Sequence, residues 1–222
     1  MNLGRLNPYV RGLRTFPGDA ALAYQLEGAA GLWRALAERS LYHLARHGHL
    51  LVIAQTLDSF REVPPPGGVT IAQATAASWQ ALAPIATQRT LDRFHQRSAR
   101  GHVCLVAWRG DRAIGYTWCA ERVGPDILPY PISFPPTAAY LFDLYVVRPE
   151  RANGVGSALV SARLTWARER GLGEGWRMIS PSNHASVRTV EKTAGRGARV
   201  VGEIRYVRIL GRVYGRYQPL GQ

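Results

Sequence analysis

The residues whose types and spacing point most clearly to chemistry form the turn Arg151-Ala152-Asn153-Gly154-Val155-Gly156, with the pattern R-x-x-G-x-G. The apolar run 139–147 before this turn predicts a strand, and apolar residues at helical spacing after Val155 predict a helix that stops at Gly171. Glycines let backbone N–H groups come close to a ligand, and a helix start directs free N–H groups toward an anion. Together with the charge of Arg151, this turn predicts a phosphate-binding site.

Two acidic side chains could act as a general base beside this turn. Asp143 belongs to the strand that precedes the turn, and regular alternation places it on the same face as Leu141 and Tyr145. Glu121 follows the second strand of an earlier hairpin. We treat Asp143 and Glu121 as candidate bases for a reaction at the anion site.

The histidines do not form a recognisable metal site. His43, His47 and His49 stand close together, but no carboxylate or cysteine accompanies them at a known ligand spacing. His102 begins a predicted strand and is expected to be structural. We therefore predict no metal.

The two cysteines lie in a predicted hairpin with strands 103–108 and 113–120. Pairing about the Gly-Asp turn puts Cys104 opposite Thr117 and only diagonal to Cys119. Diagonal partners are ~7–8 Å apart, which is too far for an unstrained disulfide. We predict free thiols in the core and a reducing, cytoplasmic environment.

The charge of the chain indicates an anionic partner. Its 28 Lys and Arg residues against 15 Asp and Glu residues give a net charge of +13. Three prolines and two glycines at 64–68 form a linker, and the segment before it carries seven Arg against five acids, so +11 of the +13 belongs to residues 69–222. We expect residues 1–68 to be an N-terminal helical extension with a short strand, and residues 69–222 to be the main domain. Nucleic acid, a membrane surface, an acidic carrier protein and a polyphosphate cofactor all satisfy the charge.

The hydrophobic pattern predicts alternating strands and helices, and neither a signal peptide nor a membrane-spanning helix. In the first part we expect helical residues from about Leu22, capped by Asp19 and interrupted at Gly28 and Gly31, and then a strand at 49–56. The elements expected in the second part are a strand at 69–72, helices at 76–86 and 91–98, the hairpin, the strand at 139–147, the helix from Val155, a strand at 176–179, a helix at 185–193, and strands at 199–210 and 212–217.

This order of elements resembles the GCN5-related N-acetyltransferase (GNAT) superfamily over residues 69–217. Three segments carry the resemblance: LVAWRGDRAIGYTW, LFDLYVVRPERANGVGSALV and NHASVRTVEKTAGRGARVVGE. It implies an α/β (α+β) protein with the GNAT-like fold, in which a mixed central sheet contains a splayed pair of parallel strands. The N-terminal helical extension would be added to this fold.

The resemblance also implies residues that bind acetyl-CoA, or another acyl-CoA, as co-substrate. Backbone groups of Tyr145, Val146 and Val147 would bind the pantetheine arm as an added strand. Asn183 matches the family position that reaches this arm, with Ser186 close by. The turn would wrap the pyrophosphate with Arg151, Ala152, Asn153, Gly154, Val155, Gly156 and Ser157.

The implied reaction is direct transfer of an acetyl group to a primary amine, with no covalent enzyme intermediate. A backbone N–H of the splayed strand commonly polarises the carbonyl in this family, and acids at the position of Asp143 are often structural. Many relatives protonate the leaving thiolate with a tyrosine of the last helix, but Val190 occupies that position here. The proton source therefore stays open between His184, Tyr145, Tyr206 and solvent.

Two other functions stay open at this point. The basic surface and the extension motivate an enzyme similar to long-chain N-acyl amino acid synthases, which takes its acyl group from an acyl carrier protein. The missing tyrosine motivates a non-catalytic module that binds acyl-CoA or nucleic acid, although no nucleic-acid reading motif is recognised and we expect no such partner. The acceptor, a small molecule or a protein amine, and the choice between monomer and homodimer are also left open.

The proline-rich loop 124–137 is expected to wall the acceptor site. Its apolar content favours a hydrophobic acceptor or a longer acyl chain. The apolar side chains concerned are Ile127, Leu128, Tyr130, Ile132 and Phe134.

Overall fold

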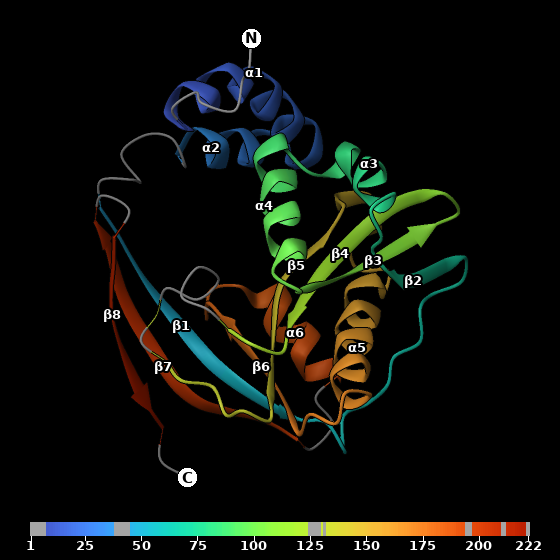
Figure 1. The fold of residues 1–222 in the computed structure, drawn as a ribbon, viewed down its shortest axis with the longest axis vertical. Coiled ribbons are helices and arrows are strands. Elements are labelled where there is room, and N and C mark those ends of the chain that lie inside the picture. The colour runs from blue at the N-terminus through green and yellow to red at the C-terminus, as the bar shows by residue number, and fades with distance from the viewer. Residues whose placement is uncertain are drawn as a thin grey trace.

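A computed structural model describes residues 8–37, 45–123, 130, 132–193, 197–209 and 212–220 of the chain (Figure 1). The helices within these ranges are α1 (Pro8–Glu27), α2 (Ala29–Ala37), α3 (Ser78–Leu82), α4 (Gln88–Ala99), α5 (Val155–Arg168) and α6 (His184–Thr193), with short 3-10 turns at Ala83–Ile85 and Arg148–Glu150. The strands are β1 (Ala45–Thr56), β2 (Val69–Gln73), β3 (Val103–Arg109), β4 (Arg112–Ala120), β5 (Ala138–Val146), β6 (Glu174–Ile179), β7 (Ala198–Ile209) and β8 (Arg212–Pro219).

The strands form one mixed sheet in the order β2-β3-β4-β5-β6-β1-β7-β8. β5 and β6 are parallel neighbours, and every other neighbouring pair is antiparallel. The pairing of β5 with β6 ends at Tyr140 and Trp176, after which the two strands diverge (Figure 1). The predicted mixed sheet with a splayed parallel pair is confirmed.

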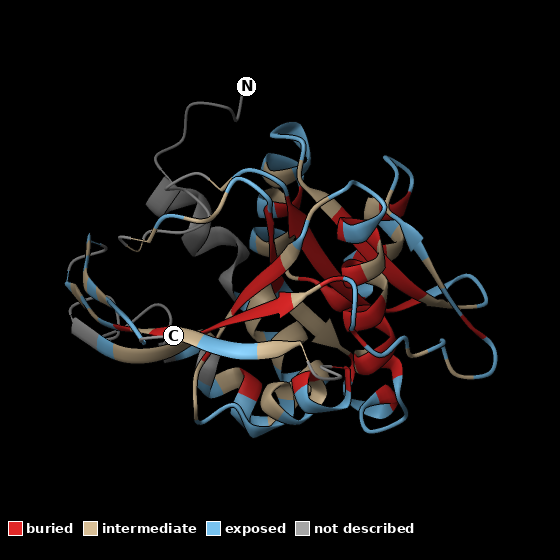
Figure 2. Ribbon diagram, turned by 90° about the horizontal axis from the view of Figure 1, so that it is seen from below, coloured by how far each residue is buried: buried red, intermediate tan, exposed pale blue. Residues whose placement is uncertain are grey.

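The helices cover the two faces of the sheet around β3, β4 and β5. Phe94 of α4 packs with Trp118 and Phe142 in one core cluster. The neighbouring strand residues Cys119 and Leu141 point the other way and join the α5 side chains in a second cluster. Buried residues are accordingly concentrated in the central strands and the helix packed on them (Figure 2).

A bulge shifts the register of the β3–β4 hairpin by one residue. Cys104 pairs with Trp118, and not with Thr117 as predicted, because the register changes between Ala107 and Trp108. The predicted free cysteines are confirmed: Cys104 and Cys119 are both buried and unpaired. Burial raises the pKa of the Cys119 thiol to about 12, so this sulfur is protonated and unreactive at neutral pH.

β1 comes from the segment before the proline linker and lies inside the sheet, between β6 and β7. Its residues Val52 and Ala54 are fully buried, and Ile53 between them is also in the core. A run that is apolar on both faces is typical of an interior strand. The predicted strand at 49–56 is thus confirmed and extends back to Ala45, while a domain boundary at residue 68 stays a prediction.

The two N-terminal helices are separated at Gly28, as predicted, whereas the predicted interruption at Gly31 is wrong, because Gly31 lies within α2. Gly28 has a φ of +65°, which a glycine adopts without strain, and α2 begins at the next residue. Asp19 does not cap this helix, because α1 already begins at Pro8. Its carboxylate instead accepts a hydrogen bond of 3.2 Å from the Gln88 N–H at the start of α4, which ties α1 to the main domain. Within the described ranges, no helix combines the length and apolar character that a membrane crossing requires.

Removing two methyl groups from β1 tests its place in the sheet. We expect Val52→Ala to lower the free energy of unfolding by about 1–3 kcal/mol, because Val52 is fully buried. Val200→Ala on β7 is the matched control, since Val200 is 42% exposed, and it should change stability by less than about 0.5 kcal/mol. Urea unfolding should show one transition in both variants. Equal effects, or a separate transition for the N-terminal segment, would contradict an interior β1.

Candidate functional site

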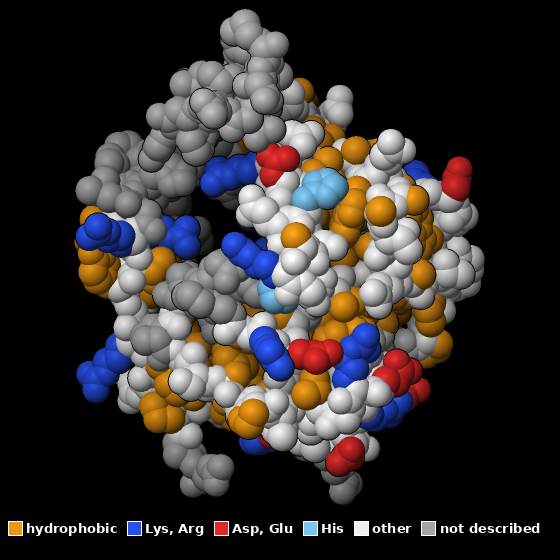
Figure 3. All heavy atoms as spheres, in the orientation of Figure 1, with side chains coloured by type: hydrophobic (Ala, Val, Ile, Leu, Met, Phe, Trp, Pro, Cys, Tyr) orange, Lys and Arg blue, Asp and Glu red, His pale blue; other side chains and the backbone are white. Residues whose placement is uncertain are grey.

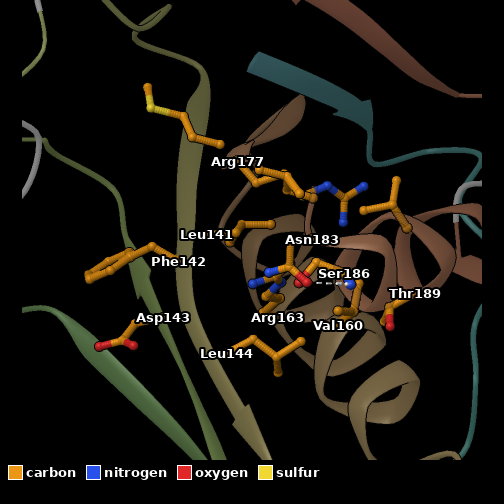
Figure 4. Close-up of a pocket in the computed structure, with 13 residues that line it drawn as sticks. Leu141, Phe142, Asp143, Leu144, Val160, Arg163, Arg177, Asn183, Ser186 and Thr189 are labelled. Carbon is orange, nitrogen blue, oxygen red and sulfur yellow. Dashed lines mark hydrogen bonds between the residues drawn. The ribbon is translucent and has the colours of Figure 1, made fainter. Parts of the chain in front are cut away.

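A cavity of about 220 Å³ lies where β5 and β6 diverge (Figure 4). Its walls are formed by β5, β6, α5 and α6, so it follows directly from the splayed pair. Polar and charged side chains line it alongside apolar ones. The residues used below are Asp143, Leu144, Arg163, Arg177, Asn183, Ser186 and Val190.

A β-bulge in β5 stands at this cavity. Asp143 has a φ of +52°, and both Asp143 and Leu144 fall opposite Thr117 of β4 in the register. The extra residue reverses the alternation of side chains along β5. Leu141 therefore faces α5, whereas Asp143 and Tyr145 face α4. The predicted common face is confirmed for Asp143 with Tyr145 and wrong for Asp143 with Leu141.

The Asp143 carboxylate is held by Arg97 of α4. The Arg97 Nη1 and Asp143 Oδ2 atoms are 2.5 Å apart. The guanidinium also lies over the rings of Trp118 and Phe142, 5.3 and 4.9 Å from their centroids. Figure 4 shows Asp143 and Phe142 on one side of β5, with Arg163 and Asn183 on the other. The candidate base is thus oriented toward the α4 face of the splay.

The R-x-x-G-x-G turn has the geometry of an anion cradle at the end of β5. Ala152 and Gly154 both have positive φ, at +65° and +85°, and Gly154 is the residue before α5. Only glycine adopts the Gly154 conformation without strain. Because α5 begins at Val155, the N–H groups of its first turn have no acceptor within the helix and point out of it.

Glu150 anchors this turn to the β3–β4 hairpin. Its carboxylate is buried and accepts two hydrogen bonds from Arg109, of 3.0 and 2.8 Å, with Arg112 at 3.4 Å. The hydrogen bond from Arg109 is the main reason that the pKa of Glu150 lies below its ordinary value. The acid of the Arg148-Pro149-Glu150 segment is therefore a structural anchor.

Arg151 is already engaged by the N-terminal extension. Its Nε donates to the Val146 carbonyl at 2.9 Å, and its two terminal nitrogens bond the Glu27 carboxylate, one of them at 3.1 Å. Glu27 is the last residue of α1 and is 124 positions away in the chain. The guanidinium predicted to bind pyrophosphate thus has an internal carboxylate as partner.

The backbone of β5 offers fewer free groups than the sequence predicted. The Val147 N–H donates to the Ile114 carbonyl at 3.0 Å, and the Val147 carbonyl accepts from the Glu150 N–H at 3.0 Å. Successive strand residues direct these groups to opposite edges, so Val146 faces the opening toward β6. Of the three residues predicted to bind pantetheine, Val146 is the one whose backbone faces the side of the cavity. The Val147 N–H is already bonded to β4.

Asn183 and Ser186 lie together at the start of α6. The Asn183 Oδ1 accepts a hydrogen bond of 3.1 Å from the Ser186 N–H and so caps the helix (Figure 4). The Asn183 NH₂ group stays available as a donor beside the cavity. His184 follows and is exposed, and the buried Val190 lines the cavity at the position where the resemblance implied a tyrosine.

Three other predicted catalytic residues make contacts away from the cavity: Glu121, Tyr145 and Tyr206. Glu121 is not brought to the site, because it follows the end of β4 opposite Tyr140 and pairs with Arg170 at 3.0 Å. Tyr145 stacks on the ring of Tyr116, and Tyr206 packs on Tyr130, with centroids 5.4 and 5.0 Å apart.

The acceptor loop is described only in part. Gly124, Ile127 and Leu128 lie outside the described residues. Phe134 packs on Tyr140 and Trp176, with centroids 5.3 and 5.1 Å away, at the end of the splay where β5 and β6 still pair.

Positive charge is dispersed over the surface. Figure 3 shows basic side chains in separate groups and not in one continuous patch. Several have acidic partners, such as Arg168 with Glu62 and Arg199 with Glu174, both at 2.6 Å. On the face shown in Figure 3, the described arginines therefore do not form one extended patch.

Sequence reasoning missed three arginines at this site, Arg97, Arg163 and Arg177. The signal for Arg163 and Arg177 is a charged residue within an otherwise apolar segment, as in the strand Trp-Arg-Met-Ile of β6, whereas Arg97 lies in the polar segment of α4 and gave no such signal. Glu27 gave no such signal, because its role depends on a contact between distant segments.

Comparisons with known proteins give one family and several similar folds. Residues 69–195 match the family model described as "Acetyltransferase (GNAT) family". No curated protein matches the chain. A Drosophila protein of known structure is 12% identical with a TM-score of 0.53, covering 83% of this chain and 68% of that one.

Two further structures are similar over different lengths. The glucosamine N-acetyltransferase region of a fungal multidomain β-N-acetylglucosaminidase is 11% identical with a TM-score of 0.54, covering 83% of this chain and 23% of that one. A putative acetyltransferase from Salmonella typhimurium, solved with acetyl-CoA, is 21% identical with a TM-score of 0.43, covering 56% of this chain and 78% of that one. The Drosophila and fungal structures support the same fold.

Because Glu150 anchors the turn through an ion pair, we expect the stability of the folded protein to fall at acidic pH. Because the folded-state pKa of Glu150 is lowered, its contribution is complete above the ordinary carboxyl pKa and is lost as the pH falls through the folded-state pKa. We expect Glu150→Gln to lower the melting temperature by a few degrees at neutral pH, and this gap to close on acidification. Glu191→Gln, on the exposed face of α6, is the control and should match the wild type throughout. A gap that is constant with pH would contradict the ion-pair anchor.

Proposed function

The chain belongs to the acetyltransferase (GNAT) family and is a GNAT-type N-acetyltransferase, and from this premise we propose that it transfers an acyl group, acetyl in the simplest case, from acyl-CoA to a primary amine. The observation that carries the proposal is the anion cradle at residues 151–157, which follows the end of β5, the strand that forms one wall of the cavity. A thioester with a long phosphate-bearing arm matches this pair of features, because phosphate can bind the free N–H groups and the arm can lie along the open edge of β5 that leads to the cavity.

Binding would use free N–H groups of the chain, together with Arg151, which would have to leave or share the Glu27 carboxylate. The first-turn N–H groups of α5 and the Arg151 guanidinium would hold the pyrophosphate. Val146 would bond the amides of the pantetheine arm from the free edge of β5, and the Asn183 NH₂ group would reach the same arm from α6. Ala152, Asn153, Ser157 and Ser186 stay predicted contacts of this set.

For catalysis we propose Asp143 as the base. The amine must lose a proton as it attacks the carbonyl carbon, and a carboxylate held in place can accept that proton directly or through water. Arg97 fixes the orientation of Asp143 on the α4 face, which is where the acceptor would arrive. A backbone N–H at the bulge would polarise the carbonyl.

The leaving thiolate needs a proton that Val190 cannot supply. We propose that it comes from solvent at the cavity mouth, where the exposed His184 follows Asn183. Reaction by direct attack agrees with the two buried thiols, neither of which is available as a nucleophile.

The free thiols also support a reducing compartment, and we propose that the enzyme acts in the cytoplasm. The acceptor is a small-molecule or protein amine. A carrier-protein donor and a homodimer stay predictions of the sequence.

Calorimetric titration with acetyl-CoA tests the cofactor site. We expect roughly micromolar affinity for the wild type, and a loss of about 10- to 100-fold for Arg151→Ala and Gly154→Glu, which remove a charge and fill the cradle. Glu27→Gln should bind more tightly, because it removes the carboxylate that competes for Arg151. The control is Arg205→Ala, since Arg205 is exposed on β7. Wild-type protein that is folded but binds no acetyl-CoA would refute the proposal.

Asp143→Asn tests the base. Thiol release from acetyl-CoA would be followed with a panel of small, hydrophobic and peptide amines. With any amine that the wild type accepts, we expect kcat to fall about 100-fold while KM for acetyl-CoA changes little. Glu121→Gln should leave both constants unchanged, because Glu121 is paired with Arg170 away from the cavity. If the two variants behave alike, Asp143 is not the base.

A further inference from the structure

Two arginines are buried at the cavity without an acidic partner. Arg163 of α5 is 4% exposed and Arg177 of β6 is 1% exposed. Arg163 donates to the Thr117 hydroxyl and Arg177 to the Gln55 side-chain oxygen, each at 3.2 Å. Among the described residues, neither lies within ion-pair distance of a carboxylate.

Both guanidinium groups also keep unused donors. The Nε of Arg163 and the Nε and Nη1 of Arg177 have no hydrogen-bond partner in the described part of the chain. Buried charges in proteins are normally paired, since an uncompensated one costs several kcal/mol. Burial lowers the pKa of Arg163 to about 10 and that of Arg177 to about 9, and the charge of Arg163 contributes to the shift of Arg177. Two cations that remain charged at neutral pH thus face one cavity, and the one carboxylate among its described lining residues, that of Asp143, is paired with Arg97 instead.

The position of Arg163 and Arg177 relative to the bulge indicates which part of a bound thioester would reach them. Thr117, which holds Arg163, stands opposite the bulge at Asp143 and Leu144. Arg177 directly follows Trp176, where the pairing of β5 with β6 ends, so it belongs to the closed end of the splay. A thioester that enters from the turn at 151–156 and stops at the bulge would direct the far end of its acyl group toward these two side chains. Figure 4 shows Arg163, Arg177 and Asn183 among the residues that line this cavity.

The cavity is large enough for an acyl group longer than acetyl. Its 220 Å³ corresponds to about seven water molecules at ~30 Å³ each. A four-carbon acyl group with a terminal carboxylate therefore has room. Guanidinium groups bind carboxylates through their N–H donors, and within the described residues the Nε of Arg163 and the Nε and Nη1 of Arg177 are free to do so.

We propose that Arg163 and Arg177 form a subsite for the carboxylate of a dicarboxylic acyl group, so that the preferred donor is the CoA thioester of a dicarboxylic acid. This inference rests on the proposed function and specifies its donor. In the reaction the amine nitrogen bonds to the thioester carbon and the carbon–sulfur bond breaks. The amine proton goes to Asp143, the thiolate takes a proton from solvent, and the distal carboxylate stays unchanged on the arginines.

The test compares succinyl-CoA with acetyl-CoA and with butyryl-CoA, which has a similar length but no charge. We expect the wild type to bind succinyl-CoA at least about tenfold more tightly than either neutral thioester. Arg163→Met and Arg177→Met should lose this preference and keep their affinity for acetyl-CoA. Arg168→Met is the matched control, because Arg168 is an exposed arginine of the same helix, and it should keep the preference. Equal affinity of the wild type for all three thioesters would overturn the inference.

A free dicarboxylic acid could bind the two arginines in the same way as a carboxylate on the donor. A second titration distinguishes free succinate from succinyl-CoA. If free succinate binds to the CoA-saturated enzyme and requires Arg177, while succinyl-CoA has no advantage, the carboxylate is not part of the donor and the assignment is overturned. The melting temperature of the unliganded variants is the readout for a purely structural role. We expect Arg163→Met and Arg177→Met to melt no lower than the wild type, since each removes an unpaired charge. Clear destabilisation together with unchanged donor preference would make the arginines structural.

The proposed function and this inference fail in different ways. A wild type that binds no CoA thioester refutes the function. A wild type that binds acetyl-CoA at the cradle, with loss in Arg151→Ala but no preference for succinyl-CoA, keeps the function and refutes the dicarboxylic donor.

Discussion

The parallel pairing of β5 and β6 ends at Tyr140 and Trp176, and the rest of the site depends on the space that this leaves. A strand inside a sheet normally bonds on both edges, and its N–H and C=O groups must find partners. β5 keeps β4 on one edge and loses β6 on the other, so a length of backbone is left for a ligand. The turn at 151–156 closes the open end of that space with a helix start, and buried side chains close the other end.

The bulge at Asp143 places different side chains on the two faces of β5. By adding one residue opposite Thr117, it turns Asp143 toward Arg97 and α4, while Leu141 and Leu144 keep their contacts on the cavity side. The proposed proton acceptor and the proposed acyl-binding cavity are thereby placed on opposite sides of a single strand. In a regular strand, Asp143 would point into the cavity beside Arg163 and would neutralise it.

Features that depend on local sequence could be predicted, and features that depend on pairing between distant segments could not. The hairpin, the glycine break at Gly28 and the turn at 151–156 follow from turn chemistry and periodicity, and the splayed sheet follows from the resemblance to the GNAT superfamily. The face of Asp143 follows from a bulge, which is a property of the β4–β5 register. The place of β1 between β6 and β7, the use of Asp19 at α4 and the burial of Arg177 each require tertiary packing that no local pattern contains.

The contact between Glu27 and Arg151 couples the docking of α1 to the occupancy of the cradle. A phosphate that takes Arg151 must displace or share the Glu27 carboxylate, so a bound ligand weakens one of the bonds that holds α1 in place. Thermodynamic reciprocity requires the converse in equal measure: whatever draws α1 off the main domain strengthens the binding of the ligand by the same free energy. If the cradle binds phosphate as proposed, the N-terminal extension is an internal competitor whose strength can be adjusted from outside the active site.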